Sequence, residues 1–344
     1  MLCLGVETSC DETAIALVED GRTIRSNLIL SQIDKHQKFG GVVPELAARC
    51  HLEVISRLTA EALQEAEVAP EAIDLVAATY GPGLIGGLLV GLSLAKALSL
   101  AWKVPFVGVN HVEGHIYANF LAHRDLEPPL ICLTVSGGHT QLVLMPEHGR
   151  YELLGQTRDD AAGEAFDKVA RVLGLGYPGG PRVDRLAKTG QPTLTLVQHD
   201  ALAGTYDFSF SGLKTAVVNL VHNLEQKGEP IPVADVAASF QRQVVTILMD
   251  RTFRALEENN VKTLALSGGV AANSELRARF AAEAEARGVK LYYPPLALCT
   301  DNAAMIAACG YFQWLREGAS PLALAANPRL RFEPPLVGAD KNSL

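Results

Sequence analysis

Several common features are missing from this 344-residue sequence, and each absence narrows the class of protein. Its six cysteines form no CxxC pair, which favours reduced thiols in a cytoplasmic protein. The first residues, MLCLGVETSCDE, carry acid where a signal peptide has a basic region and a long apolar core. The longest uncharged run, residues 81–95, is shorter than the ~18 residues of a membrane span. We therefore expect no membrane association, and the glycines of this run predict a buried helix packed closely on a strand.

Positive charge is also in short supply. Lys and Arg number 30 against 38 Asp and Glu, which gives a net charge of −8. A protein that binds nucleic acid through a broad basic face is usually basic. Any nucleic-acid partner must therefore meet a local patch, or a partner subunit must help to bind it. The composition, 48% hydrophobic and 20% charged, is otherwise that of a globular protein, and the length predicts two domains or lobes.

Two halves of the chain share one pattern. Each begins with an apolar run, a short polar centre and a second apolar run, which predicts a β-hairpin. Each continues, after a helical stretch, with a strand, a glycine turn and a helix. The hairpins span residues 2–20 and 130–145, and the strand–turn–helix units span residues 74–98 and 263–280. Because N–H groups at such turns and at helix N-termini bind phosphate, we expect two α/β halves around a phosphate-binding cleft.

A loop at residues 177–188 leads into a further helix. Pro178 and Pro181 stiffen this loop, and the two glycines between them let a ligand approach closely. In the helical stretch before it, Phe166 and Val169 belong to an apolar face from which Asp167 is excluded. This pattern alone favours a solvated Asp167.

The segment HVEGH places His111 and His115 four residues apart. On a helix, residues at this spacing lie on one face, as two ligands of one metal must, although such a pair also arises by chance. A zinc peptidase needs the sequence HExxH, and Val112 occupies the position of its glutamate. Glu113 lies roughly 200° around the helix from His111, so it cannot reach a metal bound by both histidines.

Two histidines leave a metal under-ligated, so a carboxylate from elsewhere in the chain is needed. Asp301 is the best candidate, because it follows an apolar run and precedes a predicted helix. The same position also suits an N-capping acid, and the residues alone leave both interpretations open. A site of two histidines and one aspartate with open positions suits a Lewis-acid role on phosphate or carbonyl oxygens.

Nine short motifs follow one another in a fixed order. They are ETSCDET from Glu7, GPGL from Gly81, NHVEGH from Asn110, VSGGHT from Val135, GEAFDK from Gly163, YPGGP from Tyr177, FSFSGLKT from Phe208, LSGGVAAN from Leu266 and CTDNAAM from Cys299. With these motifs the chain closely resembles the tRNA adenosine threonylcarbamoyltransferase family, once labelled O-sialoglycoprotein endopeptidase. The resemblance covers about residues 2–331, and the length is similar to that of the bacterial branch.

The resemblance implies an α/β protein with a two-lobed actin/Hsp70/sugar-kinase-like fold and an interlobe cleft. We expect residues 1–129 to form the first lobe, with residues 300–344 packing back on it, and residues 130–299 to form the second. The implied activity is transfer of threonylcarbamoyl from threonylcarbamoyl-AMP to N6 of an adenosine in tRNA. That adenosine lies just 3′ of the anticodon, in tRNAs that read codons starting with A.

The resemblance also implies ligands and partners. His111, His115 and Asp301 would bind one divalent metal, iron or zinc. The substrate, an adenylate that ATP or ADP also resembles, would contact Thr134, Val135, Ser136, Gly137, Gly138, Asp167, Gly180, Asp184 and Asn273. Bacterial relatives work with tRNA, a catalytically inactive paralogue and a small P-loop ATPase.

The chemistry of an acyl-adenylate agrees with this site. A mixed anhydride needs its oxygens bound and the attacking amine oriented. An aromatic amine such as N6 must also lose a proton, and Asp11 and Glu12 at the tip of the first hairpin are candidates to assist, or are simply solvated acids. Three rival functions stay open on the residues: an ATP-hydrolysing kinase-like enzyme, a metallopeptidase, and a non-enzymatic nucleotide-binding scaffold.

Overall fold

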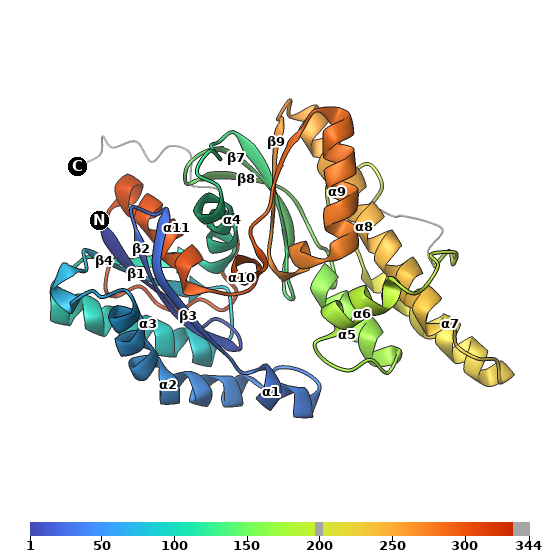
Figure 1. Cartoon of the computed structure of the whole chain (residues 1–344), viewed down its shortest axis with the longest axis horizontal. Helices are drawn as coiled ribbons and strands as arrows, with labels where there is room; N and C mark the ends of the chain where they lie inside the picture. Colours follow the sequence, from blue (N-terminus) through green and yellow to red (C-terminus); the bar gives the residue numbers. More distant parts are fainter. Residues whose placement is uncertain (197–201, 333–344) are drawn as a thin grey trace.

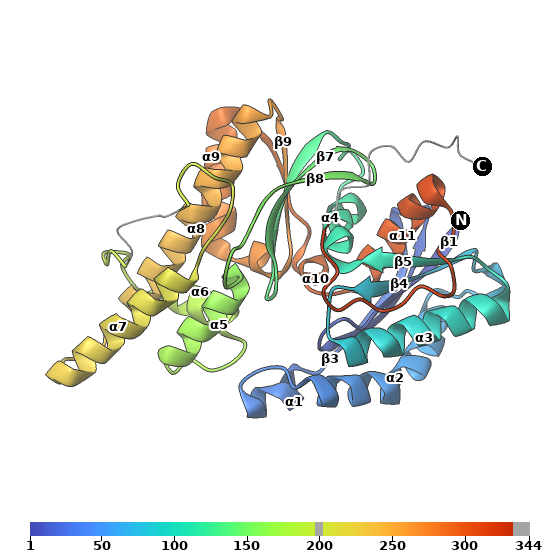
Figure 2. The ribbon, with the colours of Figure 1, turned by 180° about the vertical axis from the view of Figure 1, so that it is seen from behind.

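The computed structural model describes residues 1–196 and 202–332, and within these residues it contains two five-stranded sheets. Figures 1 and 2 show the two sheets with the helices around them. The first sheet has the strand order β3-β2-β1-β4-β5. Strands β1, β2 and β3 are antiparallel neighbours, whereas β4 and β5 run parallel to β1. The bounds are β1 Leu2–Glu7, β2 Glu12–Glu19, β3 Thr23–Ser31, β4 Leu75–Gly81 and β5 Phe106–Asn110.

The second sheet repeats this topology. Its order is β10-β9-β6-β7-β8, with an antiparallel meander of β6, β7 and β8 and with β9 and β10 parallel to β6. The bounds are β6 Leu130–Val135, β7 Thr140–Glu147, β8 Arg150–Gln156, β9 Thr263–Ser267 and β10 Lys290–Tyr292. Both predicted hairpins and both strand–turn–helix units are therefore confirmed. We call the two sheets, each with the helices packed on it, the first and the second lobe.

Helices cover both faces of the first sheet, which is why its strands are apolar on both sides. On one face, Leu4 and Val6 of β1 pack with residues of α2 (Pro44–Glu65) and α3 (Ile85–Trp102). On the other face, α11 (Ala303–Glu317) lies directly on β1. A Cβ at Gly5 would come within 2.2 Å of the Ala303 carbonyl oxygen, so only glycine permits this approach.

Helix α3 only partly matches the expected buried helix. Its glycines let it approach β1, and a Cβ at Gly91 would lie 2.2 Å from Thr8 Oγ1. Its opposite face is open, with Ile85 and Leu89 about half exposed. By length and hydropathy α3 would suffice to cross a membrane, but here it packs on the sheet as part of the first lobe.

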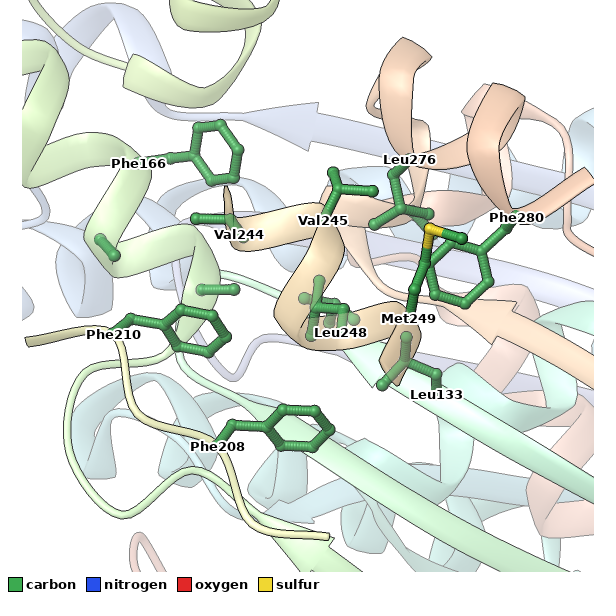
Figure 3. Close-up of a cluster of buried hydrophobic side chains, with 14 of the residues drawn as sticks. Leu133, Phe166, Phe208, Phe210, Val244, Val245, Leu248, Met249, Leu276 and Phe280 are labelled. Atoms are coloured by element: carbon green, nitrogen blue, oxygen red, sulfur yellow. The ribbon is translucent and has the colours of Figure 1, made fainter. Parts of the chain in front are cut away.

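The second lobe has its own core between its sheet and its helices. Figure 3 shows Leu133 of β6 among side chains from α5, α8 and α9, with Phe208 and Phe210 closing one side. The helices are α5 Ala162–Val172, α6 Gly179–Ala187, α7 Ser211–Lys227, α8 Val233–Glu258, α9 Ser274–Arg287 and the short α10 Leu296–Cys299.

Helix α4 (His111–Ala122) lies between the two sheets (Figure 1). Val112 and Ile116 share one apolar cluster with Leu130 and Cys132 of the second sheet and with residues of α11. Asn119 donates a hydrogen bond from Nδ2 to the carbonyl oxygen of Leu266 at 3.1 Å. The helix that carries both histidines of HVEGH is thus buried where the lobes meet.

Part of the C-terminal segment returns to the first lobe. Helix α11 packs on the first sheet, and beyond it Asn327 donates from its backbone N–H to the Tyr80 carbonyl oxygen at 2.7 Å. Residues 333–344 of the segment lie outside the described residues.

Candidate metal centre and active site

The carboxyl ends of β1, β4 and β5 lie at one edge of the first sheet, where α/β proteins gather ligands. Glu7 ends β1, and Asn110 ends β5. The Asn110 side chain caps α4 by accepting a hydrogen bond from the Val112 N–H at 2.9 Å. This cap starts the helix at His111 and so directs both histidines, one turn apart, to the same side.

His111, His115 and Asp301 converge at this edge, and we call them the metal triad. Asp301 Oδ1 lies 3.4 Å from Nε2 of His111 and 3.4 Å from Nε2 of His115. The three ligand atoms all lie within 4.8 Å of one another. Both histidines are buried, and Asp301 is partly exposed. The structure therefore brings together all three residues expected to bind a metal.

Asp301 does not cap a helix. The N-cap of α11 is Asn302, whose Oδ1 accepts from the Met305 N–H at 3.0 Å. The interpretation of Asp301 as an N-cap is therefore wrong: the cap is the next residue, Asn302, and asparagine caps a helix as well as aspartate does. Asp301 is left free to point at the two histidines.

A carboxylate that the sequence reasoning missed lies behind His111. Glu7 is fully buried, and its Oε2 lies 3.0 Å from His111 Nδ1. Thr79 Oγ1 donates to the same Oε2 at 2.6 Å, which fixes the carboxylate. A histidine that donates from Nδ1 to a carboxylate presents Nε2 as a metal ligand. The available signal was the position of Glu7 at the end of β1, on the same sheet edge as the end of β5.

The charges of the triad are strongly coupled. Burial alone would raise the pKa of Asp301, but the two histidines outweigh burial and hold that pKa well below its usual value. Burial lowers the pKa of His115, so its imidazole is neutral. At His111, unlike at His115, the neighbouring carboxylates outweigh burial. Burial would lower the pKa of His111, but Asp301 and Glu7 raise it well above its normal value. Without a metal, a proton on His111 offsets the two carboxylates.

The donor set fits a divalent transition metal. Nε2 of His115, the nitrogen that faces Asp301, makes no hydrogen bond within the described part of the chain, although the ring is fully buried. Two ligand atoms ~2.1 Å from one metal at the tetrahedral angle lie ~3.4 Å apart, which is the separation of Asp301 Oδ1 from each histidine. Two imidazoles and one carboxylate suit iron or zinc and leave open positions.

Asp11 and Glu12 lie beside the triad, and we call residues 10–12 the acid turn. Burial, followed by Asp301 and Asp11, raises the pKa of Glu12 to about 9. The prediction of plainly solvated acids is wrong, because Asp11 is buried and Glu12 is mostly buried. The negative charge of Asp301 thus disfavours an ionised Glu12, and a cation between the two carboxyls would remove this repulsion.

The second lobe brings a glycine turn over the triad. The ring of His139, the residue after this turn, lies 6.2 Å from the ring of His111. Gly137 and Gly138 are exposed, and a Cβ at either would meet no heavy atom within 4 Å. The three residues before them are buried at the end of β6, where Thr134 Oγ1 shares a 2.9 Å hydrogen bond with Ser267. We call residues 136–138 the glycine turn.

Asp167 and Gly180 lie together at the start of α6. Asp167 Oδ1 accepts from the Gly179 N–H at 2.7 Å, and burial raises the pKa of this carboxyl. The prediction of a solvated Asp167 is therefore wrong, because the side chain turns back to the N-terminus of the next helix. A Cβ at Gly180 would meet no heavy atom within 4 Å. Asp11 and Asp167 both raise the pKa of Tyr177, after burial, so this loop lies near the acid turn.

Asp184 and Asn273 form a neighbouring pair. Asn273 caps α9 by accepting from the Leu276 N–H at 2.9 Å, and its Nδ2 donates to Gln241 at 2.7 Å. Asp184 accepts from Ser274 Oγ at 2.8 Å. Both side chains thus have structural partners within the second lobe.

Two cavities of the described structure have linings that include none of the triad residues. One of about 280 Å³ is lined by Phe253, Arg287 and their neighbours in the second lobe. The other, about 150 Å³, is lined by Glu113, Tyr151 and Arg316 among others. Glu113 thus faces away from Asp301, as expected, and a peptidase mechanism has no base there.

Solved structures place the fold in the actin/Hsp70/sugar-kinase class. The chain is similar to HypF from T. kodakarensis, with a TM-score of 0.60 and 14% identity over 91% of this chain and 47% of that one. It is also similar to component A of (R)-2-hydroxyglutaryl-CoA dehydratase from Acidaminococcus fermentans, with a TM-score of 0.54 and 16% identity over 92% and 100% of the two chains. At such low sequence identity, these similarities support only the fold.

The sequence comparisons identify the family. Residues 23–308 match the model of the family TsaD, tRNA N6-adenosine threonylcarbamoyltransferase. A relative of this name from Caldicellulosiruptor bescii is 57% identical over 91% of this chain and 93% of its own length. Another from Dictyoglomus turgidum is 54% identical over 96% and 98%. The chain belongs to the tRNA N6-adenosine threonylcarbamoyltransferases and is an acyltransferase that modifies adenosine in tRNA.

Proposed function

We propose that the chain transfers threonylcarbamoyl from threonylcarbamoyl-AMP to N6 of the adenosine 3′ of the anticodon, in tRNAs that read codons starting with A, with the help of a metal. One observation carries the proposal: the metal triad of the first lobe meets the open glycine turn of the second. Such a pair of features suits an anhydride whose phosphate and carbonyl oxygens both need a partner.

His111, His115 and Asp301 would bind the metal, for which iron and zinc both suit the ligands. A divalent ion there supplies Lewis-acid polarisation of an oxygen on the donor. Glu7 keeps the His111 ring in the orientation that leaves Nε2 free.

The adenylate would lie against the glycine turn, with Thr134, Val135 and Ser136 supporting that turn from the end of β6. At Gly137, Gly138 and Gly180 the space that a Cβ would occupy is empty, as the close approach of a phosphate requires. Asp167, Asp184 and Asn273 would line the rest of the site, where Asp184 and Asn273 each keep acceptor oxygens for sugar or base.

Proton removal from the N6 amine would fall to the acid turn. A general base must be ionised: without a metal the pKa of Glu12 is about 9 and the carboxyl holds a proton, whereas a cation beside Asp301 would lower this pKa and leave Glu12 able to accept the proton of N6. Asp11, buried beside Glu12, would orient the amine.

We expect three macromolecular partners: tRNA, an inactive paralogue and a small P-loop ATPase, all in the cytoplasm. The open apolar face of α3, with Ile85 and Leu89, joined by Leu52 of α2, suits the paralogue. A lobe boundary near residue 130 is consistent with the two sheets, which draw on residues 2–110 and 130–292.

The test is mass-detected N6-threonylcarbamoyladenosine in tRNA, formed from threonylcarbamoyl-AMP by wild type and by His111→Ala, His115→Ala and Asp301→Asn. We expect product from wild type and almost none from the three variants. Equal product from all four proteins would remove the triad from the reaction. ATP turnover without tRNA at the rate of transfer would favour the kinase-like alternative instead.

A further inference from the structure

A chain of buried polar side chains lies beneath the acid turn and has no part in the chemistry above. It consists of Thr13 on β2, Gln32 after β3, His36 on α1 (Ile33–His36) and His51 on α2. All four are buried, with exposures of 2% or less. Buried polar groups in such a chain fix one arrangement of the backbone around them.

The hydrogen bonds of His51 determine which nitrogen carries the proton. Nε2 lies 2.9 Å from the Cys10 carbonyl oxygen, which only accepts, so Nε2 is the donor. Nδ1 then accepts from Thr13 Oγ1 at 2.8 Å. Burial lowers the pKa of His51, which agrees with a neutral ring that carries one N–H.

Gln32 completes the attachment of the acid turn. Its backbone N–H donates to the Asp11 carbonyl oxygen at 3.0 Å, and its Nε2 lies 3.3 Å from His51 Nδ1. The same network therefore binds the backbone carbonyl groups on both sides of the Asp11 Cα: His51 binds that of Cys10, and Gln32 binds that of Asp11.

The network also extends toward the second lobe. His36 Nε2 lies 3.1 Å from Gln32 Oε1, and His36 Nδ1 accepts from the Val43 N–H at 3.2 Å. The residues between His36 and Val43, 37–42, are here called the bridging segment. Gln37 Nε2 donates to the Tyr177 carbonyl oxygen at 2.7 Å, and Arg171 donates to the Gly40 carbonyl oxygen at 2.5 Å.

We propose that His51 is a positioning residue for transfer: its Nε2–H fixes the Cys10 carbonyl and thereby sets Asp11 and Glu12 against the metal triad. Gln32 and His36 link this position to the contact of the bridging segment with the second lobe. The inference rests on the proposed role of the acid turn. A residue with only a structural role would change stability, whereas a positioning residue changes kcat at unchanged metal content and unchanged folding.

Two substitutions of His51 separate these roles. His51→Gln retains a donor near the place of Nε2, and His51→Asn retains polar atoms only near the place of Nδ1. We therefore expect His51→Gln to keep kcat within about threefold of wild type, while His51→Asn loses about 10- to 100-fold in kcat with a similar KM for tRNA. Both variants should bind the metal as wild type does and unfold at similar temperatures.

The experiment measures kcat and KM for transfer from threonylcarbamoyl-AMP to tRNA, in the complete mixture with the partner proteins. Equal kcat for His51→Asn and His51→Gln overturns the proposal. If His51→Asn fails to fold, Thr13→Val beside Thr13→Ser tests the same ring, because only valine leaves Nδ1 without its hydroxyl donor. An unchanged kcat in Thr13→Val would then overturn it.

A separate arm tests the acid turn itself. If Asp11→Asn and Glu12→Gln both transfer as fast as wild type, the proposed role of the turn fails, whatever His51 does. If these variants are slow and the His51 pair is equal, only the positioning role fails.

Discussion

Glu7 and His111 are 104 residues apart in sequence, yet their side chains meet at 3.0 Å in the buried edge of the first sheet. Their contact follows from the parallel strands β1 and β5, which end at the same edge of the sheet with β4 between them. Because Nδ1 of His111 faces a carboxylate, Nε2 is directed to Asp301. The geometry of the triad therefore depends on a residue outside the triad.

Replacing this carboxylate should weaken metal binding. In Glu7→Gln, an amide N–H facing Nδ1 favours the tautomer with its proton on Nε2, where the metal should bind. We expect a loss of about 10- to 100-fold in metal affinity, measured by competition with a chelator. Glu113→Gln is the matched control, because this acid lies on the same helix as His111 but lines a cavity on the other side. Equal affinity in both variants would show that the Glu7 contact does not orient the ring.

Asp301→Asn should lose the metal without losing stability. Asn302 caps α11, so the substitution leaves the cap intact and removes only the anionic ligand. Elemental analysis should find little metal, and the thermal midpoint of the metal-free protein should stay near that of wild type. Asn302→Ala should give the opposite pattern, with about 1 kcal/mol less stability and the metal retained. A full metal complement in Asp301→Asn would remove this residue from the site.

The sequence predicted much of this arrangement because its signals are local. Hairpins, glycine turns and the spacing of His111 and His115 can be read within short windows. The capping role could not be assigned between Asp301 and Asn302, since both side chains accept from helix N–H groups equally well. The pattern missed the burial of Asp167, because an acid off the apolar stripe of α5 can still be covered by the next helix. Glu7 and His51 depend on contacts between distant strands and helices, which periodicity does not encode.

Stability of the metal-free protein should fall with rising pH because of Glu12. The pKa of this carboxyl is raised from 4.5 to about 9 in the folded protein, so between these values the folded state holds a proton that the unfolded state has released. The contribution is full below pH 4.5 and is lost as pH rises toward 9, by at most about 1.4 kcal/mol per pH unit.

The substitution Glu12→Gln should remove this slope. Ser31 Oγ donates to Glu12 Oε1 at 3.2 Å, and the amide oxygen of glutamine can accept the same hydrogen bond. Denaturation by urea between pH 5 and pH 8 should show wild type losing stability relative to Glu12→Gln. Added metal should reduce the difference, since a cation beside Asp301 lowers the pKa of Glu12. Parallel pH profiles for the two metal-free proteins would contradict the raised pKa.

Glu113 separates transfer from the rival peptidase mechanism. Burial raises the pKa of this carboxyl to about 7, because its effect is larger than the opposing effect of Arg316. The side chain points away from Asp301 and lines a cavity on the other side of the helix. We expect Glu113→Gln to transfer threonylcarbamoyl within about twofold of wild type, because no step of transfer uses this group. A peptidase that used Glu113 as its base would lose its hydrolysis in the same variant, commonly by ~10²-fold or more. A large loss of transfer would mean that Glu113 supports the triad through α4.

The glycine turn should bind the phosphate of the adenylate, and Gly137 is the position that tests it. A Cβ there meets no protein atom within 4 Å, so Gly137→Val fits the folded protein. The same side chain would occupy the space into which a phosphate must come to reach the backbone N–H groups. We expect AMP affinity to fall by about tenfold or more, measured by calorimetry, with the thermal midpoint little changed. Gly212→Val is the control, because Gly212 has equal space around it but lies at the start of α7 in the second lobe. If Gly137→Val binds AMP as tightly as Gly212→Val does, residues 136–138 only connect β6 to β7.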